Sequence, residues 1–184
     1  MKTSKLLSLA VAGAFLASCG NGNNSNSNKS GAMGASDAAS RVYVAPGEYD
    51  EYYAFLSGGF SGQLATYGLP SGRLLKVIPV FSQDPEKAYG YNEETKPLLQ
   101  TTHGFIPWDD THHPDLSQTN GEVDGRWIFI NANNTPRVAR ISLKTFETEE
   151  ILELPNAAGN HSSTFVTQNT EYIVGGTRFS VPIP

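Results

Sequence analysis

The feature that most constrains the fold of this 184-residue chain is an internal repeat. Residues 51–81 and 125–156 share one pattern of aromatic, aliphatic and turn residues. The matching residues all lie 74 positions apart: Tyr53 with Trp127, Phe55 with Phe129, Leu64 with Val138, and Leu69 with Leu143. Pro79 and Pro155 follow at a spacing of 76, which predicts a turn two residues longer in the second copy. Such self-similarity predicts that one supersecondary unit is built twice.

Each copy contains three short runs in which apolar and polar residues alternate, separated by Gly, Asn and Pro. This alternation is typical of antiparallel strands with one packed face, and no comparably strong helical pattern follows residue 40. Repeated sheets of three or four strands predict an all-β fold, a β-propeller whose blades pack on one another. The spacing exceeds the usual blade period of about 40–50 residues, and an insertion at residues 82–124 accounts for the excess. A β-sandwich of similar hairpins is the alternative.

Residues 41–184 are numerous enough for one hydrophobic core. Two copies and the start of a third do not close a ring, so we expect this part to be the truncated N-terminal portion of a propeller domain. Residues 19–40 are rich in Asn, Ser, Gly and Ala and contain no aromatic residue, which predicts a disordered linker. The formal net charge of −5, without a basic run, argues against a nucleic-acid partner.

The first 18 residues have the organisation of an export signal. Two lysines precede an apolar run of about a dozen residues, which is well short of the roughly 20 needed to span a bilayer. The stretch "LASCG" is similar to a bacterial lipobox, so Cys19 is expected to be lipidated and to begin the mature chain; an ordinary cleavable signal is the alternative. The absence of a twin arginine favours the general secretory route. We therefore expect a periplasmic or exported protein, anchored to the membrane by lipid on Cys19.

Two adjacent histidines, His112 and His113, are the strongest chemical feature of the chain. Neutral imidazole is a good ligand for Cu, Zn, Fe and Ni. Adjacent side chains of a regular strand point to opposite faces, so the pair predicts either two metal ions or an irregular backbone, which Pro114 favours. Asp110 precedes His112 by two residues, a suitable place for a carboxylate that orients a ligating imidazole.

His161 follows the last strand-like run of the second copy, in a loop that is expected to share a sheet end with the histidine pair. His103 lies in "TTHGF" and receives no assigned role. Two histidines in a loop are more often solvent-exposed or hydrogen-bonded than metal-bound. Spacing alone therefore leaves both interpretations open.

Three segments together resemble the N-terminal part of nitrous-oxide reductase, a copper enzyme of bacterial denitrification. They are "YDEYYAFLSGGFSGQLATYGLPSGRLLKVIPVF", "DTHHPDLSQTNGEVDGRWIFINANNTPRVARISL" and "LELPNAAGNH". The most specific element is D-x-H-H followed by D-G-[RK]-x-x-F-x-N, R-V-A-R and a further histidine. The likeness runs from about Val44 to the last residue, and the export signal is similar to that of the branch of the family without twin-arginine export.

The resemblance implies a seven-bladed propeller that holds a four-copper, sulfide-bridged catalytic centre. His112 and His113 match the adjacent pair of cluster ligands and would bind different coppers, while His161 matches the ligand of the next blade. Asp110 matches the acidic residue beside the pair. The implied reaction is N₂O + 2H⁺ + 2e⁻ → N₂ + H₂O, with electrons from a periplasmic donor such as a c-type cytochrome or a cupredoxin.

The chain carries only part of what the resemblance implies. The other cluster histidines, the C-terminal domain with its dinuclear copper site and the homodimer belong to the full-length protein, as does calcium, whose ligands come from later blades. We therefore expect the chain alone to be inactive. The alternative function is an exported lipoprotein propeller that acts as a binding or scaffolding module without redox chemistry.

Overall fold

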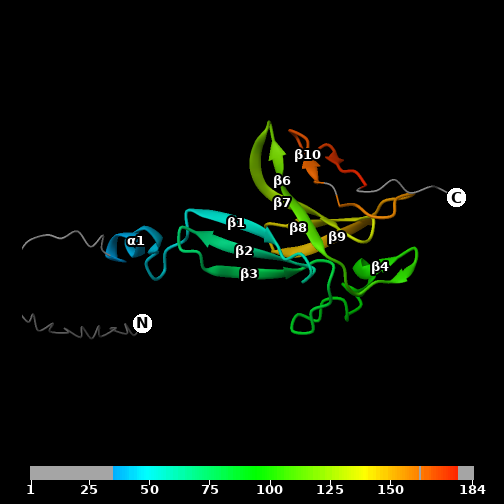
Figure 1. Cartoon of the computed structure of the whole chain (residues 1–184), viewed down its shortest axis with the longest axis horizontal. Helices are drawn as coiled ribbons and strands as arrows, with labels where there is room; N and C mark the ends of the chain where they lie inside the picture. The colour runs from blue at the N-terminus through cyan, green and yellow to red at the C-terminus, as the bar shows by residue number, and fades with distance from the viewer. Residues whose placement is uncertain (1–34, 162, 178–184) are drawn as a thin grey trace, which may run out of the picture. The chain divides into compact units, whose positions relative to one another are not determined.

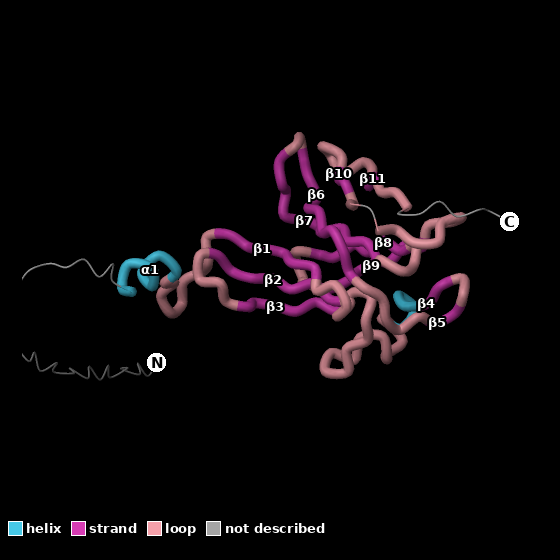
Figure 2. The backbone as a smooth tube through the Cα atoms, in the orientation of Figure 1, coloured by secondary structure: helices cyan, strands magenta, loops and turns pink. Residues whose placement is uncertain are grey.

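The computed structural model describes residues 35–161 and 163–177, and these are built almost wholly from antiparallel strands (Figures 1 and 2). In chain order the elements are α1 (Ala35–Val42), β1 (Tyr52–Ser57), β2 (Gln63–Leu69), β3 (Leu74–Pro79), the 3-10 helix η1 (Lys96–Leu99), β4 (Gln100–Thr101), β5 (Gly104–Phe105), β6 (Thr111–Thr119), β7 (Glu122–Ala132), β8 (Arg137–Ser142), β9 (Glu147–Glu153), β10 (Phe165–Val166) and β11 (Ile173–Val174). Within these residues no helix has the length and apolar character needed to cross a membrane.

Two sheets correspond to the two copies of the repeat. Strands β1, β2 and β3 form one sheet in that order, and β6, β7, β8 and β9 form the other. The pairing registers are the same at a spacing of 74: Phe55 pairs with Thr66 in the first sheet, and Phe129 pairs with Arg140 in the second. The bulge after Thr66 also recurs after Arg140. The predicted repeat is therefore confirmed at the level of individual residue pairs.

The predicted longer turn in the second copy is wrong. Pro79 pairs with Gln63, and the pair at the same positions of the second copy is Glu153 with Arg137. The spacing of 74 therefore persists to the end of the last strand, and Pro155 lies two residues beyond it. Proline lacks a donor N–H and is tolerated at the end or the outside of a strand, so the two prolines occupy different places without any change in the turn.

The two sheets share one hydrophobic core. Its buried members come from both copies and include Leu64, Ile78, Val80 and Phe81 from the first and Ile128, Ile130, Ala132, Ala139 and Ile141 from the second. Each sheet consists of strands that follow one another in the chain. A sandwich of the immunoglobulin kind exchanges strands between its sheets, whereas propeller blades are sheets of consecutive strands. The described chain is accordingly a partial β-propeller.

The segment at residues 82–124 is only in part an insertion. Residues up to 110 form turns, η1 and the short β4–β5 pair, but β6 is the fourth strand of the second sheet. The histidine pair thus lies within a blade and not in an inserted loop.

At the N-terminal end, α1 begins at Ala35, inside the range expected to be linker. Alanine has the highest helix propensity, and alanine is frequent at this end of that range. The expected signal peptide at residues 1–18, Cys19 and the rest of the linker lie outside the described residues.

Candidate metal centre

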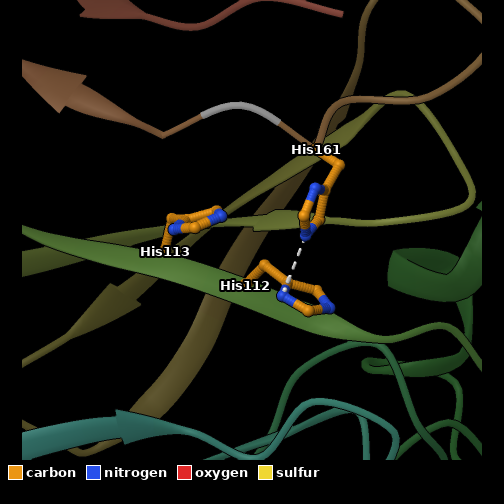
Figure 3. Close-up of side chains that lie close together, drawn as sticks. All are labelled: His112, His113 and His161. Carbon is orange, nitrogen blue, oxygen red and sulfur yellow. Dashed lines mark hydrogen bonds between the residues drawn. The ribbon is translucent and has the colours of Figure 1, made fainter. Parts of the chain in front are cut away.

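Three histidine side chains from two segments of the chain converge at one end of the second sheet. His112 and His113 belong to β6, and His161 lies in the connection between β9 and β10 (Figure 3). One nitrogen from each ring can be chosen so that all three lie within 4.8 Å of one another. The ring centroids are 4.3 Å apart for His112 and His161, and 5.1 Å apart for His113 and His161. The structure therefore brings together the three residues that the sequence singled out.

A β-bulge allows the two adjacent histidines to share one side of the strand. His112 pairs with Asn131 and Asp115 pairs with Phe129, so three steps along β6 face two steps along β7. An extra residue of this kind breaks the alternation of side chains and re-aims them. His113 takes up the change with a φ of 49°, in the left-handed region that non-glycine residues seldom adopt. The expected backbone irregularity is thus a bulge inside the strand.

The rings differ in their access to solvent. His112 and His161 are half-buried, whereas His113 is exposed. Nε2 of His161 lies 3.2 Å from Nδ1 of His112, which is hydrogen-bonding distance (Figure 3). Nε2 of His112 is buried and has no hydrogen-bond partner among the described residues. Buried polar atoms are almost always satisfied, so this nitrogen is available to a ligand.

Asp110 lies beside His112 but does not form the orienting hydrogen bond that its spacing suggested. Its Oδ2 is 3.7 Å from Nε2 of His112, longer than a hydrogen bond, and accepts one from Nδ2 of Asn133 at 3.1 Å. The Asp110 side chain is only 4% exposed, and a carboxylate so placed favours a bound cation nearby.

The sequence does not predict a buried ion pair that lies next to the site. Oδ2 of Asp109 lies 3.6 Å from Nη2 of Arg137, and both side chains are 1% exposed. Asp109 also accepts hydrogen bonds from Asn134 and Thr135, in the turn that follows β7. Burial lowers the pKa of Arg137, and the carboxylate of Asp109 opposes that change. In the sequence Arg137 has the appearance of an exposed strand residue, and no local pattern indicates that it is buried.

The remaining histidine, His103, is not part of the cluster. It lies in the turn between β4 and β5. The hydrogen bond from the Thr102 backbone lowers the pKa of Glu153, and the nearby His103 makes a smaller contribution.

Blades of consecutive antiparallel strands, with three imidazoles converging at the end of one sheet, define a partial β-propeller with a candidate metal centre. Several known proteins are similar to this chain in sequence. The chain is 38% identical to the nitrous-oxide reductase of Pseudomonas fluorescens over 177 residues, which cover 95% of this chain and 28% of that enzyme. It is 34% identical to the nitrous-oxide reductase of Stutzerimonas stutzeri over 95% of this chain and 27% of the enzyme.

The nitrous-oxide reductase of Cupriavidus necator is 36% identical over 84% of this chain and 26% of its own length. No family model matches the chain. The chain is therefore related to the nitrous-oxide reductases over nearly its whole length, as the resemblance of its motifs implied. It spans about a quarter of the length of the curated relatives that it matches.

Proposed function

We propose that this chain is part of an enzyme that reduces nitrous oxide, and that His112, His113 and His161 hold copper in it. One observation carries the proposal: three imidazoles from two segments converge in a chain that is 38% identical to a nitrous-oxide reductase. Solvent-exposed histidines that bind no common ligand are not expected to converge, because ordering their side chains costs entropy.

The donor set suits copper. Neutral imidazole is a favourable ligand for Cu, and two nitrogens bound to one ion through bonds of about 2.0 Å lie roughly 3.3 Å apart at a tetrahedral angle. His161 and His112 present nitrogens 3.2 Å apart, and the third ring adds one within 4.8 Å. The trio therefore fits one ion after a small shift of a ring, or neighbouring ions of a cluster.

Copper, when bound, would supply the electron transfer of N₂O + 2H⁺ + 2e⁻ → N₂ + H₂O. The residues of this chain hold and orient it. His112 and His161 would approach it from the protein side because they are half-buried, and His113 from the exposed side. Asp110 adds a buried negative charge 3.7 Å from the His112 ring, which favours a cation. We assign the three histidines to a tetranuclear copper–sulfide centre that is completed by histidines from outside this chain.

The cellular setting belongs to the same proposal. The apolar run before Cys19 supports a signal peptide at residues 1–18, lipidation of Cys19 and a periplasmic location. The electron donor would be a periplasmic c-type cytochrome or cupredoxin, and the complete enzyme a homodimer.

The test is expression of the complete gene that encodes this chain in a host that assembles copper centres, followed by an assay of nitrous-oxide consumption with a reduced viologen dye. We expect consumption in the wild type and a loss of at least about 100-fold in His113→Ala, because a metal ligand is removed. The matched control is His103→Ala, which removes the histidine outside the cluster and should retain activity.

Two results would contradict the proposal. One is wild-type protein that retains copper without consuming nitrous oxide, and the other is a His113→Ala variant as active as the wild type. Protein that retains no copper at all would instead favour the exported scaffolding module.

A further inference from the structure

We infer that Asn131 is a positioning residue, whose buried side-chain amide holds the connection bearing His161 against the strand that bears His112 and His113. This inference rests on the proposed metal site. It concerns how the chain assembles two distant segments into that site, since neither segment adjoins the other in the sequence.

Asn131 contacts both segments. It is in β7, and it pairs directly with His112 across the β6–β7 ladder. Its side chain is completely buried. An amide there is costly to bury unless its donors and acceptor are satisfied, so its partners indicate what it does.

Those partners lie on either side of His161. Nδ2 of Asn131 donates to the backbone carbonyl of Asn160, the residue immediately before His161. Oδ1 of Asn131 accepts a hydrogen bond of 3.2 Å from the hydroxyl of Thr164, three residues after it. The amide also donates to the carbonyl of Ala132 at 3.2 Å, which fixes its orientation. One side chain thus binds the chain on both sides of the third imidazole.

The rest of this region is attached to β6 independently. The Val166 N–H donates to Asp115 at 2.9 Å, and the Gln118 N–H donates to the Thr170 hydroxyl at 2.8 Å. These bonds hold β10 and the turn after it, beyond the His161 connection. Loss of the Asn131 amide should therefore move His161 without detaching the β10–β11 pair, so its effect on the metal site should exceed its effect on the fold.

The test compares Asn131→Val with wild-type chain. Valine fits a strand and adds no buried charge, but it leaves the Asn160 carbonyl and the Thr164 hydroxyl without their partner. Two properties are measured: the contact between the His112 and His161 rings, from nuclear Overhauser effects in metal-free protein, and Cu(I) affinity, by competition with a chelator. We expect the ring contact to disappear and the affinity to fall by about 10–100-fold.

A second pair of variants keeps the test decisive if Asn131→Val does not fold. Thr164→Val removes only the hydroxyl that donates to Asn131, and should weaken both the ring contact and the affinity. Its matched control is Thr66→Val, an identical change at a fully buried threonine whose hydroxyl has no partner among the described residues. The control should alter neither property.

The outcomes separate this inference from the proposed function. Wild-type protein that shows the ring contact but binds no copper would refute the metal site. The ring contact in the variants would then still test the positioning role of Asn131. Variants that fold, keep the ring contact and bind copper as the wild type does would overturn the positioning role. Equal losses in Thr164→Val and Thr66→Val would also overturn it, because the effect would then be a general one of core polarity.

Discussion

At the scale of single residues, the two adjacent histidines have different backbones as well as different exposure. His112 lies in the regular part of β6, paired with Asn131, whereas His113 occupies the bulge with a φ of 49°. An L-residue in the left-handed region costs roughly 1–2 kcal/mol relative to its preferred conformations. Of the two histidines, only His113 therefore has a backbone conformation that costs free energy, and this conformation directs its side chain toward the candidate site.

This difference predicts opposite effects of glycine at the two positions. His113→Gly should leave the free energy of unfolding unchanged or raise it by up to about 0.5 kcal/mol, since glycine adopts positive φ without strain but loses more chain entropy. His112→Gly, the matched control in regular strand, should lower it by about 1 kcal/mol. Both should weaken copper binding. Urea denaturation of the metal-free chain measures the difference, and equal destabilisation would show that the strain at His113 is absent.

At the scale of elements, the two sheets use equivalent aspartates in different ways. Asp50 and Asp124 occupy positions 74 apart in the repeat. Asp50 lies two residues before β1, whereas Asp124 lies within β7, because β7 begins earlier than its counterpart. Asp50 bonds to Ser71 and Arg73 at the β2–β3 turn, and a Cβ at Gly68 would lie only 2.1 Å from its Oδ2. Asp124 bonds instead to Arg126 and to hydroxyls of β6, the strand that has no counterpart in the first sheet. The additional strand thus changes the partner of the repeated residue.

The environment of Asp124 predicts a pH dependence. The Arg126 hydrogen bond, with smaller contributions from Ser117 and Thr119, holds the pKa of Asp124 below its ordinary value despite some burial. A lowered folded-state pKa stabilises the fold above the unfolded value of about 3.9, and this stabilisation is lost as the pH falls. Asp124→Asn should therefore melt at a lower temperature than the wild type at pH 7, and the gap should begin to narrow as the pH falls below about 4.

Thermal melts between pH 7 and pH 3 at constant ionic strength measure this gap. The control is Glu93→Gln, at an exposed carboxyl, which should show no comparable gap at pH 7. A gap for Asp124→Asn that widens toward low pH would contradict the assigned ion pair.

At the scale of the whole described chain, Asp109 and Arg137 connect the two copies beside the candidate site. The Asp109 N–H donates to the carbonyl of Phe81 at 2.8 Å, and the Arg137 guanidinium lies 5.1 Å from the centroid of the Phe81 ring. Phe81 follows the first sheet, while Arg137 begins β8 of the second. Their buried charges therefore lie where the two sheets adjoin, beside the candidate metal centre.

Removal of one charge from this pair should be costly. Asp109→Asn should lower the free energy of unfolding by about 3 kcal/mol, because Arg137 is left buried without its counter-charge. The double variant Asp109→Asn with Arg137→Met should lose less than the single variant, since no isolated charge remains. Denaturant titrations of both provide the measurement. Asp84→Asn, at a partly exposed pair with Lys87, should cost less than about 1 kcal/mol. A double variant less stable than Asp109→Asn would refute the account.

The sequence alone determined the features that depend on local periodicity. Alternation at two-residue steps and the spacing of 74 predicted the strands and the two sheets of the repeat, because each blade is formed by segments close together in the chain. Tertiary structure decided the rest. Three features depend on which strands become neighbours: the bulge at His113, the burial of Arg137 beside Asp109 and the hydrogen bonds of the Asn131 amide. The residues next to each of them in the sequence do not determine those neighbours. The candidate metal centre therefore lies where two segments meet that are 48 residues apart in the chain.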